Sequence, residues 1–248
     1  MPSSSTETAF IAGATGYTGR EVVRRLAARG ISAIAHVRPD SDRLTEWRER
    51  FAALGATVDE TPWNETAMTA TLARRRPTVI FALLGTTRAR MKNLKSRGVD
   101  PQTGSYDAVD YGLTALLLRA AKTAGITPRF VYLSAIGVGP KARGGYYQAR
   151  WRLETELQAS GLPFVIARPA FISGPDREES RPSERAGATI FDGLLTAAGA
   201  VGLKKLQNKF SSLSGSELAA ALVNLALAPD AANRVFEADA LRQASADK

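Results

Sequence analysis

The 248-residue sequence contains no cysteine and only one histidine, His36. Without thiols the chain forms no disulfide, no thiolate nucleophile and no thiolate-bound metal, and one imidazole cannot build a histidine-based metal cluster or a two-histidine mechanism. We therefore expect no metal site, and any catalysis has to use other residues. Nothing near His36 in the sequence would make it a base, and we expect it at the interior or rim of a sheet.

Long apolar runs are also missing. The longest, residues 79–84, is far shorter than the ~20 residues that span a bilayer. Residues 1–8 are small and polar, without the basic start and apolar core of a secretory signal. We expect a frayed tail at residues 1–8, no association with a membrane, and a cytoplasmic protein.

The charge balance is strongly basic, with a formal net charge of +9 at pH 7. Net charge affects solubility and non-specific attraction but does not identify a binding partner. The cations here are not interleaved with aromatic residues that could stack on bases. We expect no sequence-specific binding of nucleic acid. One loop region could instead attract an anionic ligand or a protein partner through five cations: Arg88, Arg90, Lys92, Lys95 and Arg97.

The most informative segment lies near the N-terminus, where an apolar strand over residues 9–12 runs into three glycines spaced by three. An amphipathic stretch, residues 20–29, follows at once. Gly13 suits the tight turn, Gly16 lets the backbone approach a pyrophosphate, and Gly19 lets the helix pack on the sheet. This pattern predicts a dinucleotide site whose phosphate-binding loop includes Gly13, Thr15, Gly16, Tyr17, Thr18 and Gly19.

Two later strand ends complete the predicted cofactor site. Arg38 follows the strand 32–37, where an NAD site would hold an acidic residue and where an arginine can accommodate a 2′-phosphate. The sequence therefore predicts NADP (NADPH) as cofactor, with Arg43 as a second candidate and a solvated loop arginine as the alternative. Gly85 and Thr86 follow the buried strand 78–84 and leave room for ribose and nicotinamide, unless they form a plain turn.

Strands alternate with helical patterns in units of about 25–30 residues, as a parallel sheet with crossover helices requires. The chain is 44% hydrophobic and 23% charged, so it can bury a substantial core. We expect an α/β fold, a Rossmann-like doubly wound parallel sheet with helices on both faces, formed by residues 1–248 as one NAD(P)-binding domain. A small C-terminal extension, residues 172–215, should supply a substrate-side loop and lid.

Within that extension, residues 176–185 are densely charged and form either a solvated loop or the cover of a substrate pocket, and residues 188–198 could form a lid helix. Ser214 and Glu217 have the spacing of a capping box ahead of a helix over residues 218–227. Residues 234–237 could add an edge strand, and we expect the chain after them to be frayed.

Several of these residues together resemble the short-chain dehydrogenase/reductase superfamily: the three glycines, Arg38, Ser134, a tyrosine-centred helix, and Arg168-Pro169 with Gly174. Residues 84–88 and 176–182 are similar to its atypical NmrA-like branch, which includes Tat-interacting-protein-like members. The resemblance implies an NADP-binding Rossmann fold, with Ser134 and Tyr146 in the places of the active-site serine and tyrosine. Leu84 and Pro169, which lie in the shared motifs, are counted with the cofactor-binding residues.

The sequence departs from that superfamily at one position, because the tyrosine is not followed four residues later by lysine. Tyr146 has Arg150 at that spacing, and Tyr147 has Trp151. Arg150 lies on the same helical face as Tyr146 and could supply a positive field that favours phenolate. Ser134 would then hydrogen-bond the substrate oxygen. Which tyrosine faces the nicotinamide is left open, as is ordinary packing of Tyr146 and Arg150.

The leading hypothesis is an NADPH-dependent oxidoreductase that acts on a small carbonyl or alcohol substrate. The alternative is a non-catalytic NADP(H)-binding redox sensor that regulates a protein partner, because the same branch contains members that bind the cofactor without turnover. A nucleotide-sugar-type epimerase is a weaker third hypothesis. The oligomeric state is left open, with a homodimer as one option.

Overall fold

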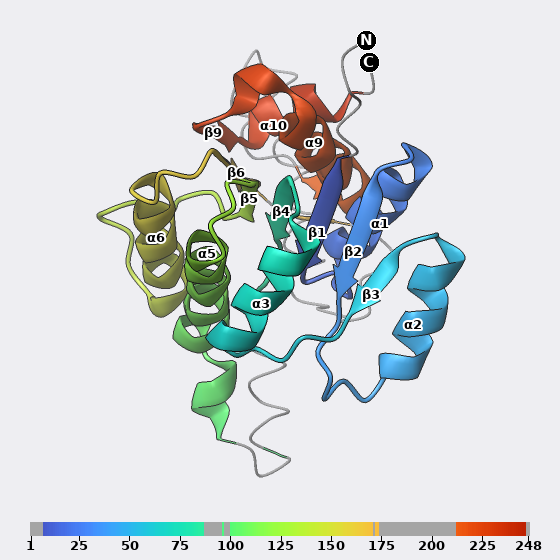
Figure 1. Ribbon diagram of the computed structural model, residues 1–248. Coiled ribbons are helices and arrows are strands. Elements are labelled where there is room, and N and C mark those ends of the chain that lie inside the picture. Colours follow the sequence, from blue (N-terminus) through green and yellow to red (C-terminus); the bar gives the residue numbers. More distant parts are fainter. Residues whose placement is uncertain (1–6, 87–95, 97–99, 171, 174–211, 247–248) are drawn as a thin grey trace.

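Seven parallel strands form one sheet in the order β3-β2-β1-β4-β5-β6-β9 (Figure 1). The computed structural model describes residues 7–86, 96, 100–170, 172–173 and 212–246. The strands of this sheet are β1 (Thr8–Ala12), β2 (Ser32–His36), β3 (Thr57–Asp59), β4 (Val79–Ala82), β5 (Arg129–Leu133), β6 (Phe164–Arg168) and β9 (Arg234–Glu237). The strand order reverses between β1 and β4, the point where open α/β sheets bind their ligands.

Helices cover both faces of the sheet, which confirms the predicted Rossmann-like fold (Figure 1). One face packs against α1 (Tyr17–Ala28), α2 (Leu44–Ala53), α9 (Gly215–Leu227) and α10 (Ala238–Ser245). The other packs against α3 (Glu65–Arg75), α5 (Thr114–Thr123) and α6 (Gly145–Gln158). The remaining described elements are the 3₁₀ turns η1 (Pro101–Gly104) and η3 (Pro229–Ala231), the π-helix η2 (Tyr106–Leu113), and a two-stranded parallel pair, β7 (Ile172–Ser173) with β8 (Leu213–Ser214).

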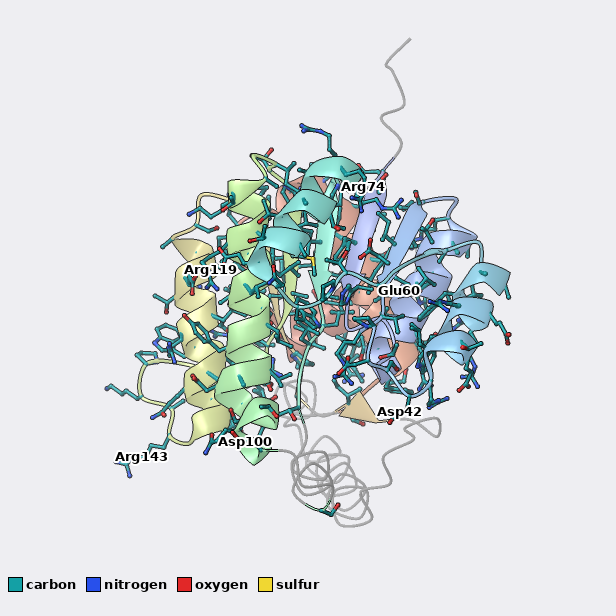
Figure 2. The ribbon with its side chains drawn as sticks, turned by 60° about the horizontal axis from the view of Figure 1, so that its bottom comes forward. Asp42, Glu60, Arg74, Asp100, Arg119 and Arg143 are labelled. Carbon is teal, nitrogen blue, oxygen red and sulfur yellow. The ribbon has the colours of Figure 1, made fainter. Side chains whose placement is uncertain are left out.

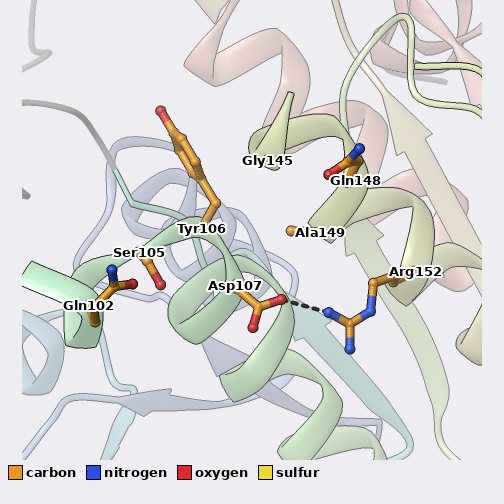
Figure 3. A pocket seen from close by; sticks show the side chains of 8 residues that line it. All are labelled: Gln102, Ser105, Tyr106, Asp107, Gly145, Gln148, Ala149 and Arg152. Atoms are coloured by element: carbon orange, nitrogen blue, oxygen red, sulfur yellow. Dashed lines mark hydrogen bonds and ion pairs between the residues drawn. The ribbon is translucent and has the colours of Figure 1, made fainter. Parts of the chain in front are cut away.

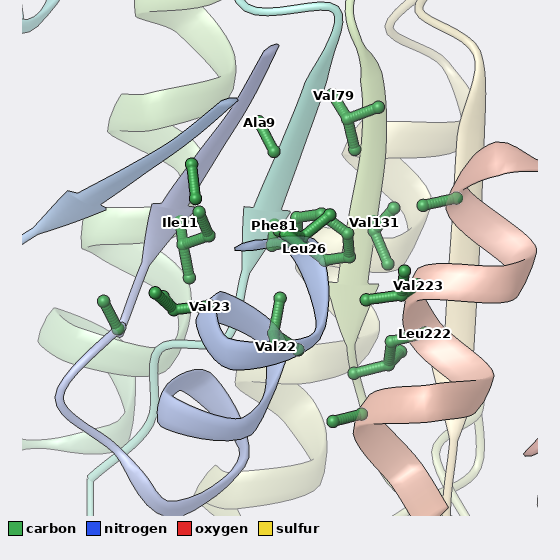
Figure 4. Packing of buried hydrophobic residues seen from close by; sticks show 14 of the residues in the cluster. Ala9, Ile11, Val22, Val23, Leu26, Val79, Phe81, Val131, Leu222 and Val223 are labelled. Atoms are coloured by element: carbon green, nitrogen blue, oxygen red, sulfur yellow. The ribbon is translucent and has the colours of Figure 1, made fainter. Parts of the chain in front are cut away.

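Alternating strand residues build the two cores, because successive side chains of a strand point to opposite faces. Ile11 of β1 packs with α1 and α9, whereas its neighbour Phe10 belongs to the core under α3 and α5. Figure 4 shows the first core, where Phe81 and Val131 meet side chains of α1 and α9. The central strand β4 is apolar and buried throughout because both of its faces are covered.

Charged side chains lie around the outside of the ribbon (Figure 2). Several of them are paired between elements, as Arg119 of α5 is with Glu65 of α3 at 3.0 Å and Arg48 of α2 is with Glu60 at 2.6 Å. In the described part of the chain these cations are therefore partly balanced by local carboxylates, despite the net charge of the whole sequence.

The predicted element boundaries are mostly confirmed within a few residues. The capping box is present: Ser214 Oγ accepts from the Glu217 N–H at 3.1 Å, and Glu217 Oε2 accepts from the Ser214 N–H at 2.8 Å. The expectation of a frayed C-terminus was wrong, because Ala238 and Leu241 are buried and anchor α10. Residues 106–123 form a continuous helical segment that begins as the π-helix η2 and goes on as α5. The basic loop, the charged loop 176–185 and the lid helix 188–198 lie outside the described residues.

Candidate active site

The glycine turn after β1 is too tight for side chains at two of its positions. Gly13 has a φ of +88°, and a β-carbon there would lie 2.6 Å from the carbonyl oxygen of Leu83. A β-carbon on Gly19 would meet the Gly13 carbonyl oxygen at a distance that real side chains do not reach. The turn is closed by a hydrogen bond from the Gly16 N–H to the Gly13 carbonyl, at 3.0 Å.

Helix α1 begins directly after this turn, with Gly16 as its N-cap. No side chain caps its first amides, and its first turn contains no acidic residue. Such a helix start attracts a phosphate group. The ring of Tyr17 turns away and packs against Gly215 at the start of α9, where the Gly215 N–H donates to the Tyr17 hydroxyl at 3.4 Å. Thr18 is buried and Thr15 is half-buried, so the backbone is the main feature that the turn presents to a phosphate.

The loop after β4 lies beside the glycine turn. Leu83 and Leu84 are the backbone neighbours of Gly13, and Gly85 comes next. A β-carbon on Gly85 would lie 3.3 Å from Nη2 of Arg150 and 3.5 Å from Oδ1 of Asp110. The loop that contains Gly85, predicted to leave room for ribose and nicotinamide, therefore lies between the glycine turn and Arg150 of α6.

Arg150 and Asp110 form a buried ion pair next to this loop. Nη2 of Arg150 lies 2.8 Å from Oδ1 of Asp110, and the exposed fractions of the two side chains are 7% and 0%. The second carboxylate oxygen of Asp110 accepts from the Thr86 N–H at 2.9 Å. Arg150 also donates to the Leu133 carbonyl at the end of β5. Sequence reasoning missed Asp110, which has no motif around it and is brought here by the π-helix η2.

Tyr146 is the tyrosine that lies next to Arg150. The guanidinium carbon is 4.6 Å from the centre of the Tyr146 ring, whereas Tyr147 is exposed. The expectation that Arg150 would make Tyr146 a phenolate needs correction. Burial raises the pKa of the Tyr146 phenol above its ordinary value, and this outweighs the opposing effect of the Arg150 cation.

Ser134 lies at the end of β5, buried and engaged inside the fold. Its Oγ donates to Oε1 of Glu154 at 2.5 Å, and the buried Glu154 also accepts two bonds from Arg168, at 3.1 and 2.5 Å. The hydroxyl proton thus goes to Glu154 rather than to a substrate position, so the predicted role of Ser134 requires that bond to be given up. Beside it, the Pro169 carbonyl accepts from the Ile136 N–H at 2.9 Å.

The two arginines proposed for a 2′-phosphate differ in their surroundings. Arg38 follows β2, is 42% exposed and pairs with Asp40 at 3.2 Å. Arg43 makes two hydrogen bonds to Glu46, at 2.7 and 2.8 Å, and its guanidinium carbon lies 4.9 Å from the centre of the Trp47 ring. The two side chains are equally exposed, at 42%, so they differ in pairing: Arg43 is held by two bonds to Glu46, whereas Arg38 makes one to Asp40. His36 is buried as expected, with its ring beside Trp63.

A pocket of about 310 Å³ lies beside α6, the helix that carries Tyr146 (Figure 3). It is enclosed by η1, η2 and α6, and the ion pair between Asp107 and Arg152, at 2.6 Å, forms part of its wall. Tyr106 lines this pocket and also meets the ring of Tyr146, with 5.3 Å between the ring centres. Its remaining lining residues are Gln102, Ser105, Gly145, Gln148 and Ala149.

Two kinds of feature are absent from the described residues. None of their helices is both long and apolar enough to cross a membrane. Nor do these residues contain a group of three or more His, Cys, Asp or Glu side chains that could hold a metal ion.

The sheet order, the glycine turn and the uncapped start of α1 are those of a dinucleotide-binding protein with a Rossmann-like fold. Residues 13–198 match the model of the NAD(P)H-binding family, and the chain belongs to this family. The predicted resemblance and the expected nicotinamide cofactor class are thereby confirmed. The choice between NAD and NADP is not made by the family match.

Curated relatives come from fungal mitochondria. The chain is 30% identical over 179 residues to protein fmp52-1, mitochondrial, of Aspergillus terreus, which covers 72% of each chain. It is 31% identical over 147 residues to protein fmp52, mitochondrial, of Aspergillus clavatus, covering 59% of this chain and 50% of the relative. Across seven such relatives, the matched stretches span 43–72% of their own length.

These relatives overturn the expected cytoplasmic location, because all seven are named as mitochondrial. The expectation rested on the lack of a secretory signal and of a long apolar run. Neither feature distinguishes the cytosol from the inside of an organelle, so the inference was unsound.

Solved structures share the fold at low identity. UDP-glucose 4-epimerase from Thermotoga maritima, solved with UDP-glucose, superposes with a TM-score of 0.60 at 18% identity, covering 92% of this chain and 75% of the epimerase. The Bordetella bronchiseptica enzyme WbmH, solved with NAD+, gives 0.57 at 20% identity, covering 88% and 71%. At these sequence identities the structural similarity supports the assignment of the fold alone.

Proposed function

We propose that this protein is an NADPH-dependent oxidoreductase of the short-chain dehydrogenase/reductase type that acts on a small carbonyl or alcohol substrate. The observation that carries the proposal is the continuous contact from Gly13 through the loop after β4 to Arg150 and Tyr146. A phosphate-binding turn and a phenol are thereby joined along the carboxyl edge of the sheet, where α/β folds bind ligands.

Each part of this edge has a task in the proposed reaction. The amides at the start of α1 bind the pyrophosphate, and the glycine turn lets it approach the backbone. The chemistry that a nicotinamide would supply when bound along this edge is hydride transfer to the substrate carbonyl carbon. Tyr146 donates its phenolic proton to the carbonyl oxygen as general acid. Arg150 stays charged at any working pH and stabilises negative charge beside the phenol.

The preference for NADPH is assigned to Arg38. A charge-assisted hydrogen bond to a phosphate contributes about 1.5–3 kcal/mol, which corresponds to about tenfold or more in affinity. Within the described part of the chain, Arg38 forms an ion pair with the exposed Asp40 alone, so it can turn to a ligand at little cost. Arg43 would first have to leave Glu46, so we expect its contribution to be smaller.

Titration of NADPH and NADH by fluorescence tests this assignment. The wild type should bind NADPH about tenfold more tightly than NADH, and Arg38→Ala should remove the difference by weakening NADPH alone. Arg50→Ala is the matched control, because Arg50 also lies on this side of the sheet and pairs with Glu46 on α2. Equal affinities of the wild type for both cofactors would refute the assignment, and a screen of carbonyl compounds for NADPH consumption tests the reaction.

A second candidate function is a non-catalytic NADP(H)-binding sensor that regulates a protein partner. It is favoured by one observation: the residues in the catalytic places are engaged elsewhere, Arg150 with Asp110 and Ser134 with Glu154. Under this alternative the protein binds NADPH with the same dependence on Arg38 and consumes none of it with any carbonyl compound. Turnover that Tyr146→Phe abolishes would exclude the sensor as the sole function.

A further inference from the structure

Asp110 stands between the loop after β4 and the tyrosine helix. It lies on the π-helix η2 and is completely buried. One of its oxygens accepts from the Thr86 N–H at 2.9 Å and the other from Nη2 of Arg150 at 2.8 Å. Burial raises the pKa of Asp110, while the Arg150 cation and the Thr86 N–H favour the carboxylate form.

The contacts of Arg150 fix its guanidinium in one orientation. Nη1 donates to the carbonyl of Leu133 and faces the Tyr132 hydroxyl at 3.5 Å, while Nη2 faces Asp110. Its guanidinium carbon lies over the Tyr146 ring, 4.6 Å from the ring centre. The charge that Tyr146 experiences is therefore that of a cation already paired with a carboxylate.

Groups from three elements face Tyr146. Arg150 and Tyr147 come from its own helix α6, Asp110 and Tyr106 come from η2, and Tyr132 of β5 lies on the other side of Arg150. Among the charged ones, Arg150 lowers the pKa of Tyr146 and Asp110 raises it. Because Arg150 and Asp110 form one buried ion pair, their opposite effects on the pKa of Tyr146 act together.

We propose that Asp110 is a positioning residue that orients and neutralises Arg150, and through it controls how Tyr146 gains and loses its proton. This proposal deepens the proposed function and rests on it, since Tyr146 is there the proton donor. It gives Asp110 a task beyond packing. With the carboxylate present, Tyr146 keeps its proton until it meets a substrate oxygen; without it, the unpaired guanidinium would favour phenolate.

Asp110→Asn removes the charge and keeps the size of the side chain. Its amide oxygen can still accept from Arg150, while the Thr86 N–H loses its acceptor. The measurement is the tyrosinate absorbance of the cofactor-free protein as the pH is raised, with far-UV circular dichroism to show that the fold persists. We expect one of the six tyrosines of the chain, a sixth of the total amplitude, to ionise at lower pH in Asp110→Asn than in the wild type.

Two variants identify the tyrosine and the cation. In Asp110→Asn/Tyr146→Phe the early step should be absent. In Asp110→Asn/Arg150→Gln, which removes both charges, the titration should return to that of the wild type. A folded Asp110→Asn protein that titrates like the wild type, or an early step that survives Tyr146→Phe, would overturn the proposal.

The test remains decisive if Asp110→Asn does not fold because a charged guanidinium is left buried. The comparison of the wild type with Asp110→Asn is then replaced by that of Arg150→Lys with Asp110→Asn/Arg150→Lys. A lysine side chain is flexible and its pKa shifts more readily on burial, so the protein tolerates it better without a counter-charge. The early step is expected in the double variant only, and its absence there contradicts the proposal. Because the titration needs neither cofactor nor substrate, a protein without turnover would refute the oxidoreductase and leave this result intact.

Discussion

Ser134 donates its hydroxyl proton to Glu154, with 2.5 Å between the two oxygens. Glu154 is completely buried on α6 and is paired with Arg168 at the end of β6. Arg168 also reaches Glu237 at the end of β9, at 3.0 Å. The bond of Ser134 therefore belongs to a network that ties the carboxyl ends of three neighbouring strands to the tyrosine helix.

This network predicts that Ser134 matters more for stability than for turnover. Ser134→Ala should lower the free energy of unfolding by about 1 kcal/mol, because one hydrogen bond to a buried carboxylate is lost. NADPH oxidation should stay within about threefold of the wild type, since the proton of Ser134 is not available to the substrate. Urea unfolding and a turnover assay measure the two effects.

Glu154→Gln is the companion variant. It removes the buried carboxylate from the pair with Arg168, which keeps Glu237 as a partner, so the cost should stay below the ~3–5 kcal/mol of breaking a fully buried pair. We expect it to be the more destabilising change. The opposite pattern for Ser134→Ala, unchanged stability with turnover reduced about a hundredfold, would return Ser134 to the substrate oxygen, where the sequence placed it.

Gly19→Ala should damage the phosphate turn. The added β-carbon would collide with the Gly13 carbonyl, and overpacking of this kind costs about 1–3 kcal/mol. Because the carbonyl belongs to the turn, we expect a lower melting temperature and at least about tenfold weaker NADPH binding.

Gly139→Ala is the control for this change, since a β-carbon there meets no atom within 4 Å. It should leave both measurements at the wild-type values. Wild-type affinity in Gly19→Ala would show that the turn does not hold the pyrophosphate.

The sequence predicted the elements that depend on local patterns. Glycine spacing and an apolar strand are sufficient for the turn from β1 into α1, and the spacing of Ser214 and Glu217 is sufficient for the capping box. These features need only residues that are close together in the chain, so a single sequence contains the whole signal.

The candidate site was less predictable because its contacts join distant segments. Asp110 meets Arg150 across 40 positions, and only the packing of η2 against α6 brings them together. Likewise, Ser134 has the position of a catalytic serine in sequence, and its partner Glu154 becomes apparent only in the folded chain. The direction of the Tyr146 pKa was mispredicted for the same reason, since spacing identifies Arg150 and does not reveal the burial that outweighs it.

His36 should make the free energy of unfolding depend on pH near the ordinary pKa of histidine. Burial lowers its pKa, with Arg38 adding to that effect and the Thr61 carbonyl and Asp59 opposing it. Below pH ~6.5 the unfolded chain binds a proton that the folded chain resists, so stability falls as the pH drops towards the folded pKa. We expect this loss to begin below about pH 6.5 and to continue down to the lowered pKa of the folded state.

Urea unfolding at several pH values measures the effect, and His36→Gln provides the control. The glutamine amide can replace the hydrogen bond from Nε2 to the Thr61 carbonyl, which is 2.7 Å long, but it does not titrate. Because the chain has no other histidine, the slope in this pH range should vanish in the variant. A slope that persists in His36→Gln would assign it to another group.

Tyr146 should favour reduction over oxidation. Its pKa is raised above the ordinary value near 10, chiefly by burial, so the phenol remains protonated at neutral pH. A protonated phenol is the form that donates to a carbonyl oxygen, whereas oxidation of an alcohol needs the phenolate as base. We expect kcat for carbonyl reduction to be flat from about pH 6 to about pH 9, and kcat for the reverse reaction to rise with pH across that range.

Two tyrosine variants connect these profiles to Tyr146. Tyr146→Phe should lower kcat by about a hundredfold or more in both directions while NADPH affinity stays nearly unchanged, as expected when a general acid is lost. Tyr147→Phe should behave like the wild type, because Tyr147 is 36% exposed and Arg150 lies against the ring of Tyr146. An oxidation rate that already levels off near neutral pH would mean that Tyr146 ionises there, and that the guanidinium outweighs burial after all. Loss of turnover in Tyr147→Phe alone would move the chemistry to the neighbouring ring.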